Sequence, residues 1–232
     1  MITFKSVSFS YPKRPQPVFN NSTFTSKIKS GDCIAIVGAN GSGKTTFLKL
    51  ISGLLTPYNG TAHIDKGLKF SYLTQLQHYD RIYPLTVFDV VNMAHPIPKL
   101  SWTKPTNKQK ELTEKALETV SLIDKKNGHI SNLSGGEFQR MLFARTLAED
   151  SNIILLDEPF TSIDETTIET LLGLMSKTTK QLNKTILCIC HDLNFAQEYF
   201  THILHIKKQQ PILYTQSDWR LFLKKNGGRY AL

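Results

Sequence analysis

The chain has 232 residues, of which 40% are hydrophobic and 20% charged, and its formal net charge is +9. This length and apolar content suit one large α/β domain or two small ones and exclude a largely disordered chain. The 28 lysines and arginines are scattered along the sequence, which indicates a solvated basic surface, so we expect no nucleic-acid partner. Because a membrane-spanning helix needs about 20 apolar residues and the apolar runs here are strand-sized, any membrane role is expected to be peripheral.

All three cysteines, Cys33, Cys188 and Cys190, lie in short apolar runs. Free thiols in such runs behave as small buried hydrophobic groups. An odd number of cysteines without a C-x-x-C pair favours a reducing cytosol over an oxidising compartment. The first ten residues, MITFKSVSFS, contain no basic segment followed by an apolar stretch, so we expect no secretory signal.

The N-terminal third predicts strands followed by one strand–loop–helix unit. Apolar residues alternate at Val7, Phe9 and Tyr11, which predicts a β-strand that ends at the proline-rich segment after it. The run CIAIVG at 33–38 predicts a buried strand. In residues 44–55 the apolar side chains recur at helical spacing, so we expect a helix there, ended by the glycine and proline that follow its apolar face.

The middle of the chain differs in amino-acid composition from both ends. A further strand is predicted at 68–73. Beyond it the sequence is rich in proline, lysine and threonine, until an amphipathic helix is predicted around 112–120. We therefore expect a single domain over the whole chain in which a mainly helical subdomain, at about 76–147, is inserted into a core made of residues 1–75 and 148–232.

Strands and helices alternate again in the last third. The runs NIILLDE and TILCIC are predicted strands, and each is followed by a predicted helix, the second a short one near 193–200. This order is typical of a mostly parallel sheet that is covered by helices on both faces. The predicted fold class is therefore α/β.

Residues 38–45, GANGSGKT, match the pattern G-x-x-x-x-G-K-[ST] between a predicted strand and a predicted helix, the context that a phosphate-binding loop requires. The glycines let backbone N–H groups turn toward phosphates, and the helix N-terminus adds partial positive charge. Lys44 would reach the outer phosphates as a catalytic cation, and the Thr45 hydroxyl would bind Mg²⁺. The candidate ATP-binding residues of this phosphate-binding loop and the helix after it are Gly38, Asn40, Gly41, Ser42, Gly43, Lys44, Thr45 and Thr46.

A pair of carboxylates ends the predicted strand in the run IILLDEP. Four apolar residues that end in two acids describe a central strand whose tip emerges at the ligand-binding edge of the sheet. We expect Asp157 to hold the magnesium ion and Glu158 to polarise the attacking water. Together with the phosphate-binding loop, this pair predicts hydrolysis of the nucleotide; on its own it would read equally well as a solvated turn.

The stretch LSGGE at 133–137 opens a predicted helix. A serine followed three residues later by a glutamate is a helix capping box and needs no ligand. Two consecutive glycines inside a helix, however, cost roughly 1 kcal/mol each relative to alanine, which indicates that something approaches the backbone closely. Since the upstream loop already surrounds one set of phosphates, we interpret Ser134, Gly135 and Gly136, here named the serine–glycine grip, as a site for the nucleotide of a second subunit.

With these pieces in this order, the chain resembles the ATP-binding subunit of an ABC transporter over essentially its full length. LSGGE resembles the signature motif of that family. The resemblance implies that Tyr11 stacks on adenine, that Gln75 is the Q-loop glutamine near Mg²⁺ and the attacking water, and that Asp164 is the D-loop aspartate at the nucleotide. It also implies that His191 is the switch histidine at the γ-phosphate. Each of these residues alone is weak evidence for the family, and taken by itself Tyr11 would be interpreted as a side chain of the hydrophobic core.

The resemblance extends to fold, cofactors and partners. It implies a P-loop NTPase core, with a mostly parallel sheet, flanking helices and N-terminal antiparallel β strands, plus the inserted helical subdomain. It implies ATP and Mg²⁺ as cofactors, a homodimer that forms on ATP binding, integral membrane permease subunits and, indirectly, an extracytoplasmic substrate-binding protein. The subunit would lie peripherally on the cytoplasmic face of the bacterial inner membrane.

The sequence indicates the transported substrate less clearly than it indicates the ATPase activity. YPLTVFDVV and DEPFTSID resemble the bacterial zinc or manganese importers, and iron-chelate or haem importers are the alternative. Two departures from the family pattern remove no group that the chemistry needs: TSID at 161–164, and Glu137 where glutamine is commoner. The seven histidines show no Cys/His spacing of a zinc site, so we expect the cargo to be bound elsewhere.

Two other classes of protein remain open. A soluble ABC protein of translation or DNA repair would suit the basic charge, but such relatives usually carry two cassettes in one chain or a long coiled-coil insertion. A small-molecule kinase with a phosphate-binding loop would leave LSGGE and His191 without a role.

Overall fold

The computed structural model describes residues 2–12, 16–65, 67–74, 81, 83–95, 105–161, 163–190 and 197–225. Gln75 and His191 lie outside the described residues. Within them the strands are β1 Ile2–Phe9, β2 Phe19–Ser26, β3 Cys33–Val37, β4 Asn59–Ile64, β5 Phe70–Leu73, β6 Ile153–Leu156, β7 Thr185–Ile189, β8 His202–Lys207 and β9 Gln210–Thr215. The helices are α1 Lys44–Ile51, α2 Val87–Asn92, α3 Asn107–Thr119, α4 Gly135–Ala148, α5 Glu165–Leu182 and α6 Gln216–Lys225, with 3₁₀ turns η1 Ile123–Lys125, η2 Ile130–Asn132 and η3 Gln197–Tyr199.

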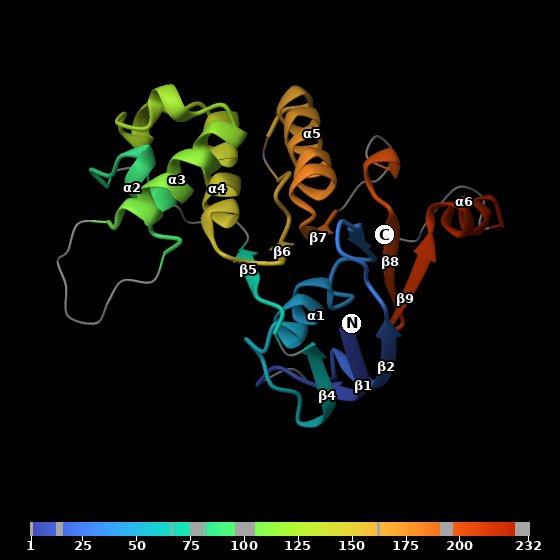
Figure 1. The fold of residues 1–232 in the computed structure, drawn as a ribbon. Coiled ribbons are helices and arrows are strands. Elements are labelled where there is room, and N and C mark those ends of the chain that lie inside the picture. Colours follow the sequence, from blue (N-terminus) through green and yellow to red (C-terminus); the bar gives the residue numbers. More distant parts are fainter. Residues whose placement is uncertain are drawn as a thin grey trace.

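The strands form two sheets (Figure 1). The larger has the order β5-β6-β7-β3-β8-β9, parallel throughout except that β9 returns antiparallel to β8. The smaller has the order β2-β1-β4 and is antiparallel. The predicted α/β class, with a mostly parallel sheet and N-terminal antiparallel strands, is therefore confirmed.

Alternate residues of the central strands enter two different cores. In β3, Cys33, Ala35 and Val37 pack with the face that α4 and α5 cover, whereas Ile34 and Ile36 pack on the opposite face. Side chains of a strand alternate between faces, so a strand that is apolar at every position must be covered on both. This is why the continuous apolar runs of β3, β6 and β7 predicted a buried sheet.

Helix α1 lies between the two sheets, and its position is set by its apolar face. Phe47 is fully buried and its ring lies 5.2 Å from Phe4 of β1 and 6.0 Å from Phe24 of β2. The same core includes Ile34 and Ile36 of β3. Figure 1 shows α1 above β1 and β4 and below the large sheet. The smaller sheet thus holds the helix that starts at the phosphate-binding loop.

Helices α2, α3 and α4 pack on one another beside the β5 end of the large sheet (Figure 1). Each begins with a complete capping box, at Thr86, Thr106 and Ser134 respectively. Such boxes satisfy N–H groups that a helix start leaves unpaired, which fixes where each helix begins. The boundaries of the expected helical subdomain, about 76–147, stay a prediction.

Strand β8 supports the phosphate-binding loop from behind. It pairs with β3 in parallel, and the carbonyl oxygen of Ile206 lies so close to Gly38 that a Cβ there would approach it to 2.5 Å. Beyond β9, α6 is anchored by Trp219, which is fully buried and stacks on Phe222. No helix within the described ranges is long and apolar enough to span a bilayer.

Candidate active site

The phosphate-binding loop is shaped by glycines for two different reasons. Gly43 has a φ of 102°, and a Cβ there would lie 2.8 Å from the Val18 side chain. A larger residue at this position would therefore collide with Val18. Gly41 has a φ of 78° but faces open space, because no atom lies within 4 Å of where its Cβ would be. A loop that is tight behind and open in front leaves its backbone N–H groups available to a ligand on the open side.

Two polar groups of this loop are buried in a way that points to a ligand. The Nζ of Lys44 donates to the carbonyl oxygens of Gly38, at 2.9 Å, and Ala39, at 3.1 Å. Burial lowers the pKa of Lys44, an effect that the nearby carboxylates of Glu158 and Asp157 oppose. The hydroxyl of Ser42 is buried without a hydrogen-bond partner among the described residues. Phosphate oxygens would satisfy both groups.

Asp157 is buried at the tip of β6 and is held by two hydroxyl groups. Thr45 Oγ1 donates to its Oδ1 at 2.9 Å, and Tyr72 Oη donates to its Oδ2 at 3.0 Å. Burial raises the pKa of Asp157, and both hydrogen bonds oppose that rise. Because hydroxyl and carboxylate oxygens are the ligands that Mg²⁺ prefers, Thr45 and Asp157 fit a magnesium site.

Tyr72 is a site residue that the sequence did not reveal. It reaches Asp157 because β5 and β6 are parallel neighbours in register, with Tyr72 opposite Leu155. Burial raises the pKa of Tyr72 well above its ordinary value, and Asp157 adds to the rise, so the phenol keeps its proton and remains a donor. The sequence does not state that these two strands are adjacent, and no motif marks the position.

Glu158 stands in a backbone conformation that non-glycine residues rarely adopt, with a φ of 55°. Such strain persists only where the surrounding structure imposes it and is concentrated at functional sites. Glu158 lines a cavity of about 400 Å³ together with the phosphate-binding loop and Tyr11. The Tyr11 hydroxyl lies 3.3 Å from Thr46 Oγ1, and its ring packs edge-on to Phe9 at 5.0 Å.

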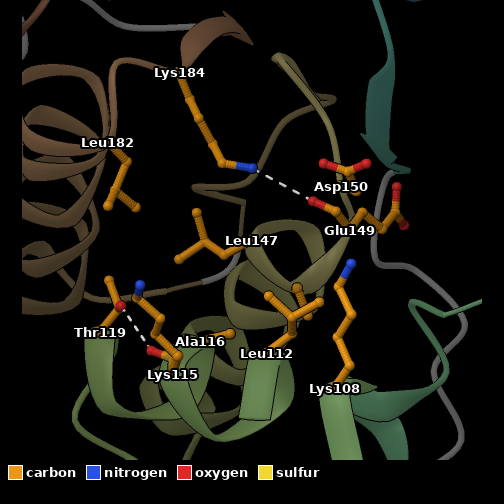
Figure 2. Close-up of a pocket in the computed structure, with 11 residues that line it drawn as sticks. Lys108, Leu112, Lys115, Ala116, Thr119, Leu147, Glu149, Asp150, Leu182 and Lys184 are labelled. Carbon is orange, nitrogen blue, oxygen red and sulfur yellow. Dashed lines mark hydrogen bonds between the residues drawn. The ribbon is translucent and has the colours of Figure 1, made fainter. Parts of the chain in front are cut away.

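Another cavity, of about 380 Å³, lies between α3, the end of α4 and the end of α5 (Figure 2). Its floor includes Leu112 and Leu147. The Nζ of Lys184 points to the backbone, donating to the carbonyl oxygens of Glu149, at 3.4 Å, and Ser151, at 2.8 Å. The residues that line this cavity include no glycine, whereas the lining of the cavity at Glu158 includes Gly41 and Gly43.

The serine–glycine grip forms the N-terminus of α4. Ser134 is the N-cap, its Oγ accepting the N–H of Glu137 at 3.2 Å. Gly135 faces open space, whereas a Cβ on Gly136 would lie 2.6 Å from Thr167 Oγ1. The close approach expected from the two glycines is therefore, at Gly136, a contact with helix α5 of the same chain. At Gly135 no atom lies within 4 Å of where a Cβ would be, and the backbone N–H groups of both glycines stand in the first turn of α4.

Asp164 is the N-cap of α5 and is fully engaged there. Its Oδ1 accepts the N–H of Thr167 at 2.9 Å and its Oδ2 accepts the Thr167 hydroxyl at 2.8 Å, while Thr166 also donates to Oδ1. These hydrogen bonds lower the pKa of Asp164 to about 2. Asp164 therefore fixes the Thr167 side chain that packs against Gly136, a connection that no spacing in the sequence indicates.

Arg81 is a second residue that the sequence did not reveal. It donates to the carbonyl oxygen of Leu133 at 3.2 Å, and its guanidinium lies 4.2 Å from the centre of the Phe138 ring. A guanidinium over an aromatic face is attracted by the ring's electrons. Arg81 thus holds the residues on either side of the serine–glycine grip.

The predicted site residues within the described ranges lie in two places. The residues around the cavity at Glu158 include Tyr11, Asn40, Gly41, Gly43, Lys44, Thr45 and Thr46. Its lining does not include the serine–glycine grip or Asp164, which lie at the starts of α4 and α5. Gln75 and His191 are outside the described residues. Across the described ranges, no three His, Cys, Asp or Glu side chains gather as a metal site.

Comparison with known proteins gives a family and several curated relatives. Residues 21–161 match the family described as ABC transporter. The manganese transport system ATP-binding protein MntB of Listeria monocytogenes is 38% identical, over 80% of this chain and 79% of the relative. MntB of Halalkalibacterium halodurans is 36% identical, over 77% and 73%. The zinc transport system ATP-binding protein TroB of Treponema pallidum is 36% identical, over 77% and 69%.

Solved structures agree on the fold. A dimeric ATP-binding cassette in a post-hydrolysis state, bound to ADP and phosphate, has a TM-score of 0.73 and 25% identity, covering 93% of this chain and 99% of its own. An ATP-binding cassette of an ABC transporter in its ADP conformation has a TM-score of 0.82, covering 98% and 96%. Because the identity to this second structure is 18%, the similarity supports the fold alone.

Substitution of each of the two adjacent glycines by alanine should have opposite effects on the stability of the chain. Gly136→Ala should lower the free energy of unfolding by about 1–3 kcal/mol, because the new methyl group overpacks against Thr167. Gly135→Ala should raise it by up to about 1 kcal/mol, because alanine favours the helix and meets nothing. Urea denaturation of the isolated chain measures both. Gly136→Ala combined with Thr167→Ala should recover part of the loss; equal effects of the two single substitutions would contradict the contact.

Proposed function

This chain belongs to the ABC transporter family, and from that premise we propose that it is the ATP-hydrolysing subunit of a transporter for a divalent metal cation, manganese or zinc. The observation that carries the ATPase is the arrangement of Lys44, Thr45, Asp157 and Glu158. All four residues lie at one edge of the sheet. Asp157 accepts a hydrogen bond from Thr45, and Lys44, Thr45 and Glu158 line the same cavity.

The residues of one chain bind and orient ATP. Backbone N–H groups of the phosphate-binding loop and the Nζ of Lys44 would bind its phosphates, and the Tyr11 ring would stack on the adenine. Thr45 and Asp157 would hold Mg²⁺, which would supply positive charge to offset the negative charge of the phosphates. Glu158 would accept the proton of the attacking water, as a base whose backbone strain aims it at the cavity. Gln75 and His191 would position the water and the γ-phosphate.

A second copy of the chain would complete the site. The Ser134 hydroxyl and the N–H groups of Gly135 and Gly136 stand at a helix N-terminus, where the first N–H groups have no partner within the helix. The lining of the cavity at Glu158 includes none of these residues from its own chain. A head-to-tail homodimer formed on ATP binding would bring each serine–glycine grip to the partner's γ-phosphate, with Asp164 at the same interface.

Transport would come from separate permease subunits. The relatives named as parts of manganese or zinc transport systems support this assignment. The helices α2–α4 and the region of Gln75 would dock on the permease at the cytoplasmic face of the membrane, and an extracytoplasmic binding protein would deliver the cation. Closing and opening of the ATPase dimer would then drive alternating access in the permease.

Glu158→Gln should trap the ATP-bound dimer. The amide cannot accept the proton of the attacking water, so turnover should fall by about 10²- to 10⁴-fold while ATP binding is retained. Size-exclusion chromatography with ATP and Mg²⁺ should show a dimer for this variant and a larger monomer fraction for the natural chain. A variant that stays monomeric at saturating ATP would contradict the shared site.

Ser134→Arg should abolish turnover without affecting ATP binding to the single chain. The arginine side chain would occupy the space through which the partner's phosphate enters, and we expect a loss of at least about 100-fold in turnover. A fluorescent ATP analogue should still bind with a dissociation constant within twofold of the natural chain. Full hydrolysis by Ser134→Arg would remove the in-trans role.

Cells that lack this subunit should take up less radioactive manganese or zinc. The natural chain should restore uptake and Glu158→Gln should not, because the permease depends on hydrolysis. Purification from detergent-solubilised membranes should bring down a multi-span subunit with the chain. Recovery of the chain only with ribosomes or DNA would favour the soluble ABC protein, and loss of iron-chelate uptake alone would favour the alternative cargo.

A further inference from the structure

Glu137 places a negative charge beside the serine–glycine grip. It is the third residue of α4, three positions after the N-cap Ser134. A carboxylate at a helix N-terminus is favourable for the helix, but it repels a second anion that approaches the same N-terminus. If the grip receives a phosphate, the charge of Glu137 must therefore be offset.

The structure shows two contacts that hold this carboxylate. Glu137 Oε2 accepts the backbone N–H of Ser134 at 3.1 Å. Glu137 Oε1 accepts a hydrogen bond from Lys125 Nζ at 2.5 Å, which is also an ion pair. The hydrogen bond from Lys125 is the main reason that the pKa of Glu137 is lowered, so the carboxylate stays ionised near neutral pH and its charge is balanced by Lys125.

The ion pair between Lys125 and Glu137 contributes little to the stability of the fold, so a different role has to explain its position beside the serine–glycine grip. The Lys125 side chain is 51% exposed, and ion pairs at such exposure stabilise a protein only slightly. Lys125 is the last residue of η1 and comes from a different element than Glu137. Its clearest effect is on the electric field at the start of α4.

The capping box leaves the hydroxyl of Ser134 able to donate. Ser134 Oγ accepts the N–H of Glu137, so its own proton remains available to an anion. Gly135 stands in open space beside it. The Glu137 carboxylate accepts the N–H of Ser134 and so lies at the same helix N-terminus as these donors, where an unbalanced charge would act against a phosphate.

We propose that Lys125 is a positioning residue for the in-trans step: by holding and neutralising Glu137, it allows the serine–glycine grip to receive the γ-phosphate of the partner's ATP. This inference rests on the proposed function, because it assumes that the grip acts on the partner's nucleotide. It assigns to Lys125 an effect on dimer closure and none on binding of ATP to a single chain.

The chain provides a matched control one residue away. Lys126 Nζ forms an ion pair with Glu114 Oε1 at 2.6 Å, on the side of α3 and away from the start of α4. Lys126→Met removes the same charge and an ion pair of similar length. A change in overall charge or in the local loop would affect both lysine variants, whereas the proposed effect belongs to Lys125 alone.

The test compares Lys125→Met with Lys126→Met in steady-state ATPase assays. Lys125→Met should raise the ATP concentration for half-maximal turnover by about 5- to 20-fold, as expected for a lost charge interaction near the phosphate. Binding of a fluorescent ATP analogue to the monomer and the urea unfolding midpoint should stay unchanged. Lys126→Met should remain within twofold of the natural chain, and Lys125→Arg should retain the natural value.

Rescue separates charge balance from a general structural effect. Glu137→Gln removes the charge that Lys125 offsets, so Lys125→Met combined with Glu137→Gln should lie within twofold of Glu137→Gln alone. A double variant as impaired as Lys125→Met, or a Lys125→Met variant equal to the natural chain, would overturn the inference. Ser134→Arg is measured in the same assay: if it is inactive while Lys125→Met is normal, only this inference fails, and if it is active, the proposed in-trans function fails.

Discussion

The burial of β3 on all sides is the constraint on which the site depends. Every residue of β3 is buried, because β7 and β8 pair with its two edges and helices or the second sheet cover its two faces. A strand that is paired at both edges cannot shift its register without breaking the hydrogen bonds to both neighbours. The chain must therefore leave β3 at one fixed point, where Gly38 passes under the carbonyl of Ile206 and α1 begins.

From that fixed point the acidic groups are positioned by sheet order. β6 lies two strands away, and β5 beyond it brings Tyr72 to Asp157. Thr45 at the start of α1 reaches the same carboxylate. The ligand-binding edge thus joins segments more than a hundred residues apart, and its burial raises the pKa of Asp157 while the hydroxyl donors oppose that rise. Such a carboxylate is suited to a cation, since a positive ion would replace the lost solvation.

The start of α4 is held by contacts with three other segments of the chain. Arg81 holds Leu133, Lys125 holds Glu137, and Thr167 packs on Gly136 while Asp164 holds Thr167. A helix N-terminus that is fixed by three elements keeps its donors in place before a ligand arrives, which reduces the entropy lost on binding. The same contacts connect this helix to α5, which begins a few residues after Glu158.

The sequence alone determined the features that are local. The phosphate-binding loop, the buried strands, the acidic pair and the capping box of LSGGE were all predicted, because each depends on residues that are close in the chain. The tertiary structure decided which residues meet across elements: Tyr72 on Asp157, Arg81 on Phe138, Lys125 on Glu137, and Thr167 against Gly136. The last contact gives Gly136 a packing role within the chain that the sequence did not indicate. Strand order and helix packing are set by how the whole core buries its apolar surface, and no local spacing records them.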